Sequence, residues 1–165
     1  MNKLVPLVCL LCGFRVLAAD FEVKQTELNR LVTIVAYGDM RFTDPSNTSA
    51  TNPKVRRWLV DKIAAENPDA ILLSGDVPWH GADSNDYAVY SEETGIWRAK
   101  HLRIYPALGN HELNGRTQEC LQNWWRAFPW LRDHRWYSVK FGDRIYILNV
   151  DSNSSLLPGS VTTSV

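Results

Sequence analysis

Residues 105–112 read Tyr-Pro-Ala-Leu-Gly-Asn-His-Glu, an apolar run that ends in a glycine followed by three polar side chains. Two earlier apolar runs also end in a glycine and a polar residue, because residues 31–39 and residues 70–76 both close on Gly-Asp. In an open α/β sheet, ligands bind beyond the carboxyl ends of the strands, where such side chains converge. The three segments therefore indicate one shared site.

Asp39, Asp76 and Asn110 are the oxygen donors that these turns present. Successive members are separated by about one strand-helix repeat, a spacing that places successive parallel strands side by side. Carboxylate and amide oxygens suit divalent cations, and His111 adds a titratable group beside them. This combination predicts a metal-dependent hydrolase.

The remaining pattern predicts an α/β fold, a layered mixed β-sheet with flanking helices. Asn52 and Pro53 are typical of a helix start, and Gly-Asp at residues 142–143 indicates a hairpin. Residues 20–30 show no clear pattern. The expected elements, in chain order, are strand 31–37, helix 53–66, strand 70–73, helix 87–101, strand 104–108, helix 117–128, and strands 135–141 and 144–150.

Composition is that of an ordinary globular protein. The 165 residues suffice for one domain with a sizeable core. Hydrophobic residues make up 45% and charged residues 22%, which argues against wholesale disorder. Lys and Arg number 18 and Asp and Glu also number 18, so the charge balance gives no sign of a nucleic-acid or membrane-surface partner.

Residues 1–19 are typical of a secretory signal, with a basic residue near the start, an apolar middle and small residues at the end. The apolar run is too short and too interrupted to span a membrane. We therefore expect export, to the periplasm or out of the cell, with residues 20–165 as the mature domain. A lipoprotein anchored at Cys9 or Cys12 is the weaker alternative. Cleavage would leave Cys120 as the sole cysteine, and its apolar neighbours favour a buried, inert thiol.

Three motifs resemble the first three motifs of the calcineurin-like metallophosphoesterases, a superfamily that includes the purple acid phosphatases. They are Gly38-Asp39, Gly75-Asp76 and Gly109-Asn110-His111-Glu112. The resemblance covers roughly residues 31–151, and the Gly-Asn-His-Glu turn is its most specific part. It implies the N-terminal half of an αββα sandwich, a phosphoric ester as substrate and two divalent metal ions as cofactors.

The resemblance also implies a role for each matching residue. Asp39 would bind one metal ion, Asp76 would bridge two, and Asn110 would bind the second. His111 would contact the phosphate and protonate the leaving group. Manganese, iron and zinc suit these donors alike, and a hydroxide activated by the two ions would attack phosphorus directly. We expect Glu112 to orient its neighbours rather than to touch a metal ion.

The sequence departs from the family pattern in three places. Arg41 stands where the family usually has a His ligand, and its guanidinium, which cannot coordinate a cation, could hold a phosphate oxygen. Trp79 stands where purple acid phosphatases have a metal-binding Tyr, which argues against their iron site. The family's later His motifs have no counterpart after His134, and a polar tail begins at Asp151. We therefore expect a domain truncated at its C-terminus, with weak metal binding and uncovered apolar sheet surface, in preference to an intact protein with a depleted metal site.

Two other functions stay open. A non-catalytic binding module could use Arg41 and the Trp-rich residues 97–136 to recognise an anionic or sugar-like ligand, and an inactive fragment is the third possibility. His80 could replace a missing ligand, although a position at the rim of the site is more common, and we expect His101 and His134 in structural or solvated positions. Monoester, diester, nucleotide and lipid substrates fit the motifs equally well, and the oligomeric state follows from none of these features.

Overall fold

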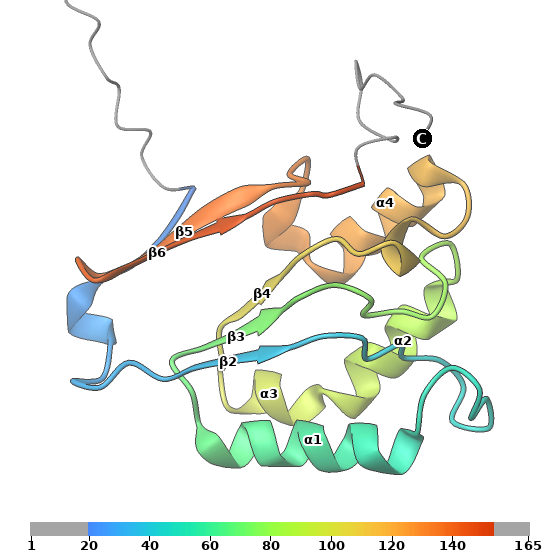
Figure 1. Cartoon of the computed structure of the whole chain (residues 1–165), viewed down its shortest axis with the longest axis horizontal. Coiled ribbons are helices and arrows are strands. Elements are labelled where there is room, and N and C mark those ends of the chain that lie inside the picture. The colour runs from blue at the N-terminus through green and yellow to red at the C-terminus, as the bar shows by residue number, and fades with distance from the viewer. Residues whose placement is uncertain (1–19, 154–165) are drawn as a thin grey trace, which may run out of the picture.

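Two three-stranded sheets form the framework of the computed structural model, which describes residues 20–153 (Figure 1). The first sheet contains, in order, β2 (Ile34–Tyr37), β3 (Ala70–Leu73) and β4 (Ile104–Pro106), and the second contains β1 (Phe21–Val23), β5 (Tyr137–Phe141) and β6 (Ile145–Asn149). The helices are α1 (Pro53–Glu66), α2 (Ser84–Glu93), α3 (Gly95–Ala99) and α4 (Thr117–Ala127), with short 3-10 turns η1 (Gln25–Glu27), η2 (His111–Leu113) and η3 (Pro129–Leu131).

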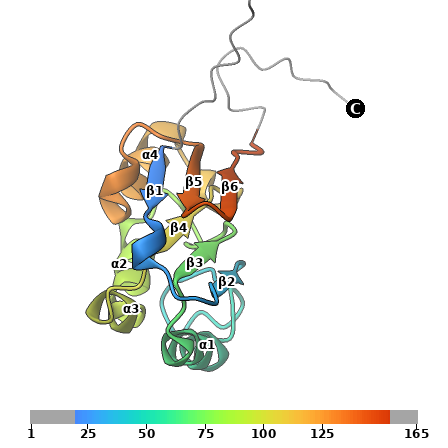
Figure 2. The ribbon, with the colours of Figure 1, turned by 90° about the vertical axis from the view of Figure 1, so that its left-hand side faces the viewer.

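The elements are stacked in layers. Helices α1 and α3 lie on one side of the first sheet, and the second sheet lies on the other side (Figures 1 and 2). The α/β fold with mixed sheets and flanking helices is therefore confirmed. The C-terminal hairpin belongs to the second sheet and not to the first.

All strands of the first sheet run parallel, as the repeating strand-helix pattern predicts. Tyr37 pairs with Leu73, and Leu73 pairs with Pro106, so the three carboxyl ends lie at one edge of the sheet. The central strand β3 is the most buried, with Ala70 and Ile71 0% exposed. Burial on both faces explains its continuous apolar sequence. The predicted alignment of the three turns is therefore confirmed.

Helix α1 has the boundaries that its sequence signals predict. The side-chain oxygen of Asn52 accepts hydrogen bonds from the backbone N–H groups of Lys54 and Val55 at 3.1 and 3.2 Å. These bonds satisfy two donors that the first turn of a helix leaves free. Asn67 ends the helix in the left-handed conformation with a φ of 47°.

The helix predicted at residues 87–101 is two helices, α2 and α3, that meet at Thr94. The hydroxyl of Thr94 donates to the carbonyl of Tyr90 at 2.6 Å, and Gly95 follows immediately. A side chain that bonds back to the preceding turn, next to a flexible glycine, bends a helix at that point. The first helix also begins earlier than predicted, because Asp83 caps it.

The second sheet is mixed. β5 and β6 form the antiparallel hairpin predicted around Gly142, and β1 adds to β5 in parallel. β1 lies in the segment that showed no pattern, since three residues are too few to display alternation. Asp20 anchors it, because its carboxylate accepts the backbone N–H of Ser138 at 2.7 Å.

Both sheets share one core. The ring of Tyr105 meets that of Phe141 edge-on at 5.5 Å, and the hydroxyl of Tyr137 donates to the carbonyl of Pro106 at 2.7 Å. Trp97 and Trp124 are also buried in this core, whereas Trp130 and Trp136 are 45% and 57% exposed. These contacts hold β4, and the turn that follows it, against the second sheet.

The outer strand β6 carries apolar residues on an exposed face. Leu148 is 70% exposed, next to the half-exposed Tyr146, and Val150, directly after the strand, is 68% exposed. Uncovered apolar sheet surface was expected, and it is present here. Cys120 is a buried free thiol, as predicted.

Two predictions concern other parts of the chain. The secretory signal at residues 1–19 and most of the polar tail, residues 154–165, lie outside the described residues. Within residues 20–153, no helix combines the length and the hydropathy that crossing a bilayer requires.

Candidate functional site

The turns that follow β2 and β3 are bonded directly to each other. The backbone N–H of Asp39 donates to the carbonyl of Gly75 at 3.2 Å, and the N–H of Arg41 donates to the carbonyl of Asp76 at 2.8 Å. Asp39, Arg41 and Asp76 all have positive φ angles, of 54°, 46° and 56°. Residues other than glycine rarely adopt this conformation, and it is concentrated at functional sites. The fold thus holds both aspartates in strained turns at one edge of the sheet.

The side chain of Arg41 lies between the two aspartates. Its Nη2 atom is 3.0 Å from Asp39 Oδ1 and 3.5 Å from Asp76 Oδ2. The carboxylate of Asp39 is 78% exposed, whereas that of Asp76 is only 10% exposed. Asp76 is therefore the enclosed acid of the pair, and one guanidinium reaches both carboxylates.

Two glycines allow the turn after β4 to approach the turn after β3. A Cβ atom on Gly109 would lie 2.3 Å from Asp76 Oδ1, and a Cβ on Gly75 would lie 2.9 Å from the Cα of Gly109. Neither distance is sterically possible for a real side chain. The glycines of the motifs are therefore needed for the close approach of backbone to carboxylate.

His111 connects the third turn to Asp76. Its backbone N–H donates to Asp76 Oδ1 at 3.2 Å, and its ring Nε2 lies 3.9 Å from Asp76 Oδ2. Ring Nδ1 is 2.5 Å from the carbonyl oxygen of Trp79, which can only accept, so Nδ1 carries a proton and donates it. Nε2 is consequently the nitrogen that faces the site.

Asn110 lies in the third turn, directly before His111. It precedes η2 directly, and its exposed side chain makes no capping hydrogen bond to that turn. Of the predicted residues, the structure therefore ties together Asp39, Arg41, Asp76 and His111 by side-chain contacts. The amide of Asn110 is exposed, and within residues 20–153 it makes no hydrogen bond to Asp39 or Asp76.

Glu112 is buried behind the turns and holds them in place. Its carboxylate accepts backbone N–H groups from Asp76 at 2.9 Å, from Val77 at 2.6 Å and from Gly109 at 2.7 Å. Burial raises the pKa of Glu112 to about 7, and these three hydrogen bonds oppose the rise. The predicted role, orienting its neighbours, matches these contacts.

The contacts of Trp79 with other site residues were not predicted from the sequence. Its ring packs against the ring of His111 at 4.8 Å, and Cζ of Arg41 lies 5.7 Å from its centroid. Trp79 therefore supports the imidazole and faces the guanidinium. The available signal was its place three residues after Asp76, in the same turn.

Asn153 was also missed. Its side-chain N–H donates to the carbonyl of Gly109 at 3.3 Å, so the chain after β6 reaches the third turn. The signal was again a polar residue just after a strand. His80, by contrast, is exposed and faces Asp86, with its Nδ1 3.9 Å from the carboxylate, which fits a rim position.

The resemblance implies two divalent cations at this site. Within the described part of the chain, no cluster of three or more His, Cys, Asp or Glu side chains could hold a metal ion. Asp39 and Asp76 offer carboxylates and Asn110 offers an amide, but the guanidinium of Arg41 occupies the space between the two acids. The donors that residues 20–153 present here therefore do not fit two divalent ions.

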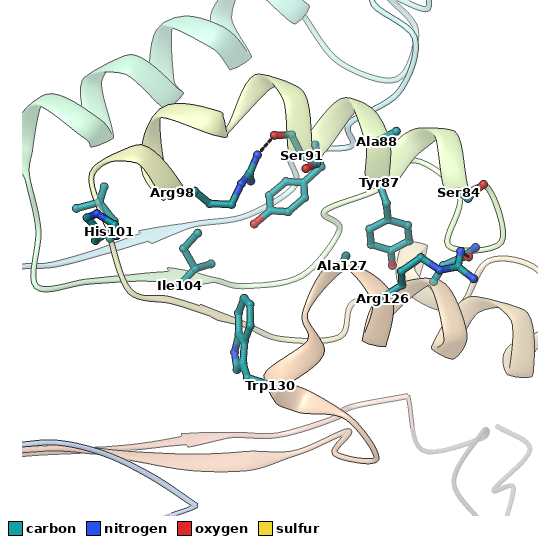
Figure 3. Close-up of a pocket in the computed structure, with 13 residues that line it drawn as sticks. Ser84, Tyr87, Ala88, Ser91, Arg98, His101, Ile104, Arg126, Ala127 and Trp130 are labelled. Carbon is teal, nitrogen blue, oxygen red and sulfur yellow. Dashed lines mark hydrogen bonds between the residues drawn. The ribbon is translucent and has the colours of Figure 1, made fainter.

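A separate cavity of about 590 Å³ lies between helices α2 and α3 on one side and α4 with η3 on the other (Figure 3). Its lining includes Arg98, His101, Arg126 and Trp130, has no acidic side chain, and contains none of the predicted site residues. The guanidinium of Arg98 donates to the carbonyl of Ser91 within it. This cavity belongs to the helix layer and not to the strand-end site.

Comparison with known proteins agrees with the motifs. The model of the calcineurin-like phosphoesterase family matches residues 32–161, which is most of the chain. No match to a curated protein was found. The family match, the parallel sheet and the Asp39, Asp76 and His111 turns coincide in the same part of the molecule. This chain belongs to the calcineurin-like phosphoesterase family.

Proposed function

We propose that this chain hydrolyses a phosphoric ester in a metal-dependent reaction at the strand ends of the first sheet. The observation that supports this most directly is the position of Asp76. Its enclosed carboxylate contacts Arg41 from the first turn and His111 from the third, so all three turns share one centre. Membership of the family suggests the same reaction class.

The proposal assigns cation binding to Asp76 and Asn110, with Asp39 paired to Arg41 beside them. A divalent ion held there would supply positive charge to the phosphoryl oxygens and would lower the pKa of a water molecule. Manganese, iron and zinc all suit these donors. The resemblance implies two ions, and the two-ion mechanism stays a prediction.

Arg41 would bind the phosphate. Its guanidinium is about one-third exposed, so it can donate to a phosphoryl oxygen while it remains paired with Asp76. A guanidinium presents several donors in one plane, which suits a phosphate better than a single ammonium does. Trp79 faces the guanidinium and limits the directions in which it can move.

His111 would protonate the leaving group. Its Nδ1 proton is committed to the carbonyl of Trp79, so a second proton on the ring must sit on Nε2. Nε2 faces Asp76 and the candidate cation site, where the ester oxygen would depart. A general acid must lie within hydrogen-bonding reach of the atom that it protonates, and Nε2 is the ring nitrogen that is turned toward this site.

A non-catalytic anion-binding module is the second candidate. The observation in its favour is the pairing of Arg41 with Trp79, at a place where residues 20–153 offer no cluster of three or more His, Cys, Asp or Glu side chains for a metal ion. Such a protein would bind inorganic phosphate equally well with and without a chelator, and it would release no product from a phosphate ester.

The experiment is hydrolysis of p-nitrophenyl phosphate and bis(p-nitrophenyl) phosphate with Mn²⁺ and with chelator. We expect Mn²⁺-dependent release of p-nitrophenol by the wild type, loss of that release in Asp76→Asn, and no change in Asp61→Asn on the exposed side of α1. Equal rates in wild type and Asp76→Asn would reject the proposal. Comparing the two esters separates a monoesterase from a diesterase.

We also propose that the protein is exported. The support is the pattern of residues 1–19, a basic start, an apolar middle and small residues before Asp20. Mass spectrometry of the protein from the periplasm and from the medium tests it. A mature chain that begins at Asp20 is expected, and an intact chain confined to the cytoplasm would reject export.

A further inference from the structure

We infer that the guanidinium of Arg41 takes the place of one metal ion, so that the centre of this chain binds one divalent cation in place of two. This inference rests on the proposed function and makes it more specific. Arg41 would supply a permanent positive charge, whereas a neutral histidine at the same position would supply a metal ligand.

The first argument is where the guanidinium lies. A cation shared by the first and second turns must contact the carboxylates of both Asp39 and Asp76. One atom, Nη2 of Arg41, already lies within 3.5 Å of an oxygen from each. A metal ion in that position would have to displace the guanidinium. Its charge therefore occupies the place between the turns that a metal ion would otherwise take.

The second argument is that the backbone holds Arg41 there. Its N–H donates to the carbonyl of Asp76 at 2.8 Å, and its φ of 46° turns the side chain out of the extended path. Both neighbours are anchored, because Met40 is 1% exposed and Phe42 is 0% exposed. The N–H of Phe42 donates to the carbonyl of Val77 at 2.7 Å. The exposed ion pair with Asp39 alone would hold the side chain weakly, but this anchored backbone fixes where it starts.

The third argument is charge. Asp39 and Asp76 carry two formal negative charges, and Arg41 balances one of them. One divalent ion beside Asp76 and Asn110 would therefore already make the net charge of these groups positive, which favours phosphate binding. A second divalent ion would lie close to the guanidinium, where repulsion between like charges is strong. The two carboxylates would attract a second ion only weakly, because the guanidinium already balances one of them. The guanidinium also stays positively charged at any ordinary pH.

The test counts bound ions. Full-length chain is titrated with Mn²⁺ alone by isothermal calorimetry, and the bound ions are examined by electron paramagnetic resonance for the multiline signal of a spin-coupled pair. The variant Arg41→His removes the charge and adds a ligand. Arg41→Met removes the charge with a side chain that is also unbranched at Cβ, so the backbone strain at φ 46° stays the same. Arg30→His is the matched control, because Arg30 is exposed and precedes the amino end of β2.

We expect one Mn²⁺ per chain in the wild type and in Arg30→His, with no coupled signal. We expect two per chain in Arg41→His, with the coupled signal present, and a weaker second ion in Arg41→Met. Two ions in the wild type would overturn the inference but leave the hydrolase proposal intact. Failure of both Arg41 variants to bind a second ion, with circular dichroism showing them folded, would also overturn it. If the wild type bound no Mn²⁺ and hydrolysed no ester, the proposed function itself would fail, and the inference with it.

Discussion

Glu112 accepts a hydrogen bond from the backbone N–H of Asp76 at 2.9 Å, although 36 residues separate the two in the chain. The same carboxylate oxygen accepts the N–H of Gly109, and the other oxygen accepts that of Val77. One buried acid therefore sets the distance between the second and third turns. The geometry of the candidate site depends on a residue that need not touch the substrate.

Replacing Glu112 with Gln should destabilise the fold by about 1–3 kcal/mol, because an amide nitrogen cannot accept and at least one buried backbone N–H loses its partner. Urea unfolding at neutral pH measures the change. Glu119→Gln is the control, since Glu119 is exposed on α4, and it should leave the free energy of unfolding unchanged. An unchanged free energy in Glu112→Gln would show that the three hydrogen bonds do not constrain the turns.

Gly109→Ala should disrupt the site, because the new Cβ would lie 2.3 Å from Asp76 Oδ1 and 2.7 Å from its backbone nitrogen. Relieving such overlap costs about 1–3 kcal/mol and moves Asp76, so hydrolysis should fall as well. Gly95→Ala offers a matched comparison, since the nearest atom to its Cβ is 3.8 Å away at the flexible end of Arg98. That variant should be neutral or more stable by up to about 1 kcal/mol, because alanine favours helix. Equal effects of the two substitutions on unfolding and rate would contradict the close packing described.

His111→Gln should slow hydrolysis most for esters whose leaving group must be protonated as it departs. A general acid typically contributes about 10²–10⁴-fold, and p-nitrophenolate departs without one. We therefore expect a large loss of kcat with an alkyl phosphate and a small loss with p-nitrophenyl phosphate. His134→Gln, at an exposed position, should affect neither. The same fractional loss with both esters would assign His111 to substrate binding and not to proton transfer.

Asp69 should make stability depend on pH. Burial raises its pKa, but hydrogen bonds from Thr33 and Asn29 outweigh burial and bring the pKa below its ordinary value. A carboxyl with a lowered pKa in the fold stabilises the protein above its unfolded pKa, near 4, and this contribution is lost as pH falls through the folded pKa. Asp69→Asn should therefore be less stable by about 1–3 kcal/mol at pH 7, and the difference should shrink below about pH 4. A difference between wild type and variant that stays constant from pH 7 to pH 3 would contradict this origin.

Local signals predicted those parts of the fold whose determinants lie within a few residues. The bounds of α1 and β3 agree with the prediction because Asn52 caps the helix and Asn67 and Pro68 separate the two elements. The break at Thr94 was missed, since it depends on a hydroxyl that bonds to the carbonyl of Tyr90. β1 was missed because it exists only through its pairing with β5, more than a hundred residues later.

The candidate site shows the same division. The residue types of the three turns, and their order, predicted that Asp39, Asp76 and Asn110 would converge with His111 beside them. The structure places Asp76 against Arg41 and His111, with Asp39 on the other side of Arg41, whereas the side chain of Asn110 is exposed. The contact of Arg41 with both carboxylates depends on the positive φ angle of Arg41, which the surrounding sequence does not predict. The packing of Trp79 on His111 is likewise a contact between residues of two different turns. It could not be predicted from the sequence of either turn alone.

The most direct test of this account is an anomalous difference map from crystals of the full chain grown with Mn²⁺. The account predicts a single manganese peak within coordination distance of Asp76 and Asn110, with Arg41 still between the two aspartates. A map with no manganese at the carboxyl ends of β2, β3 and β4 would contradict it.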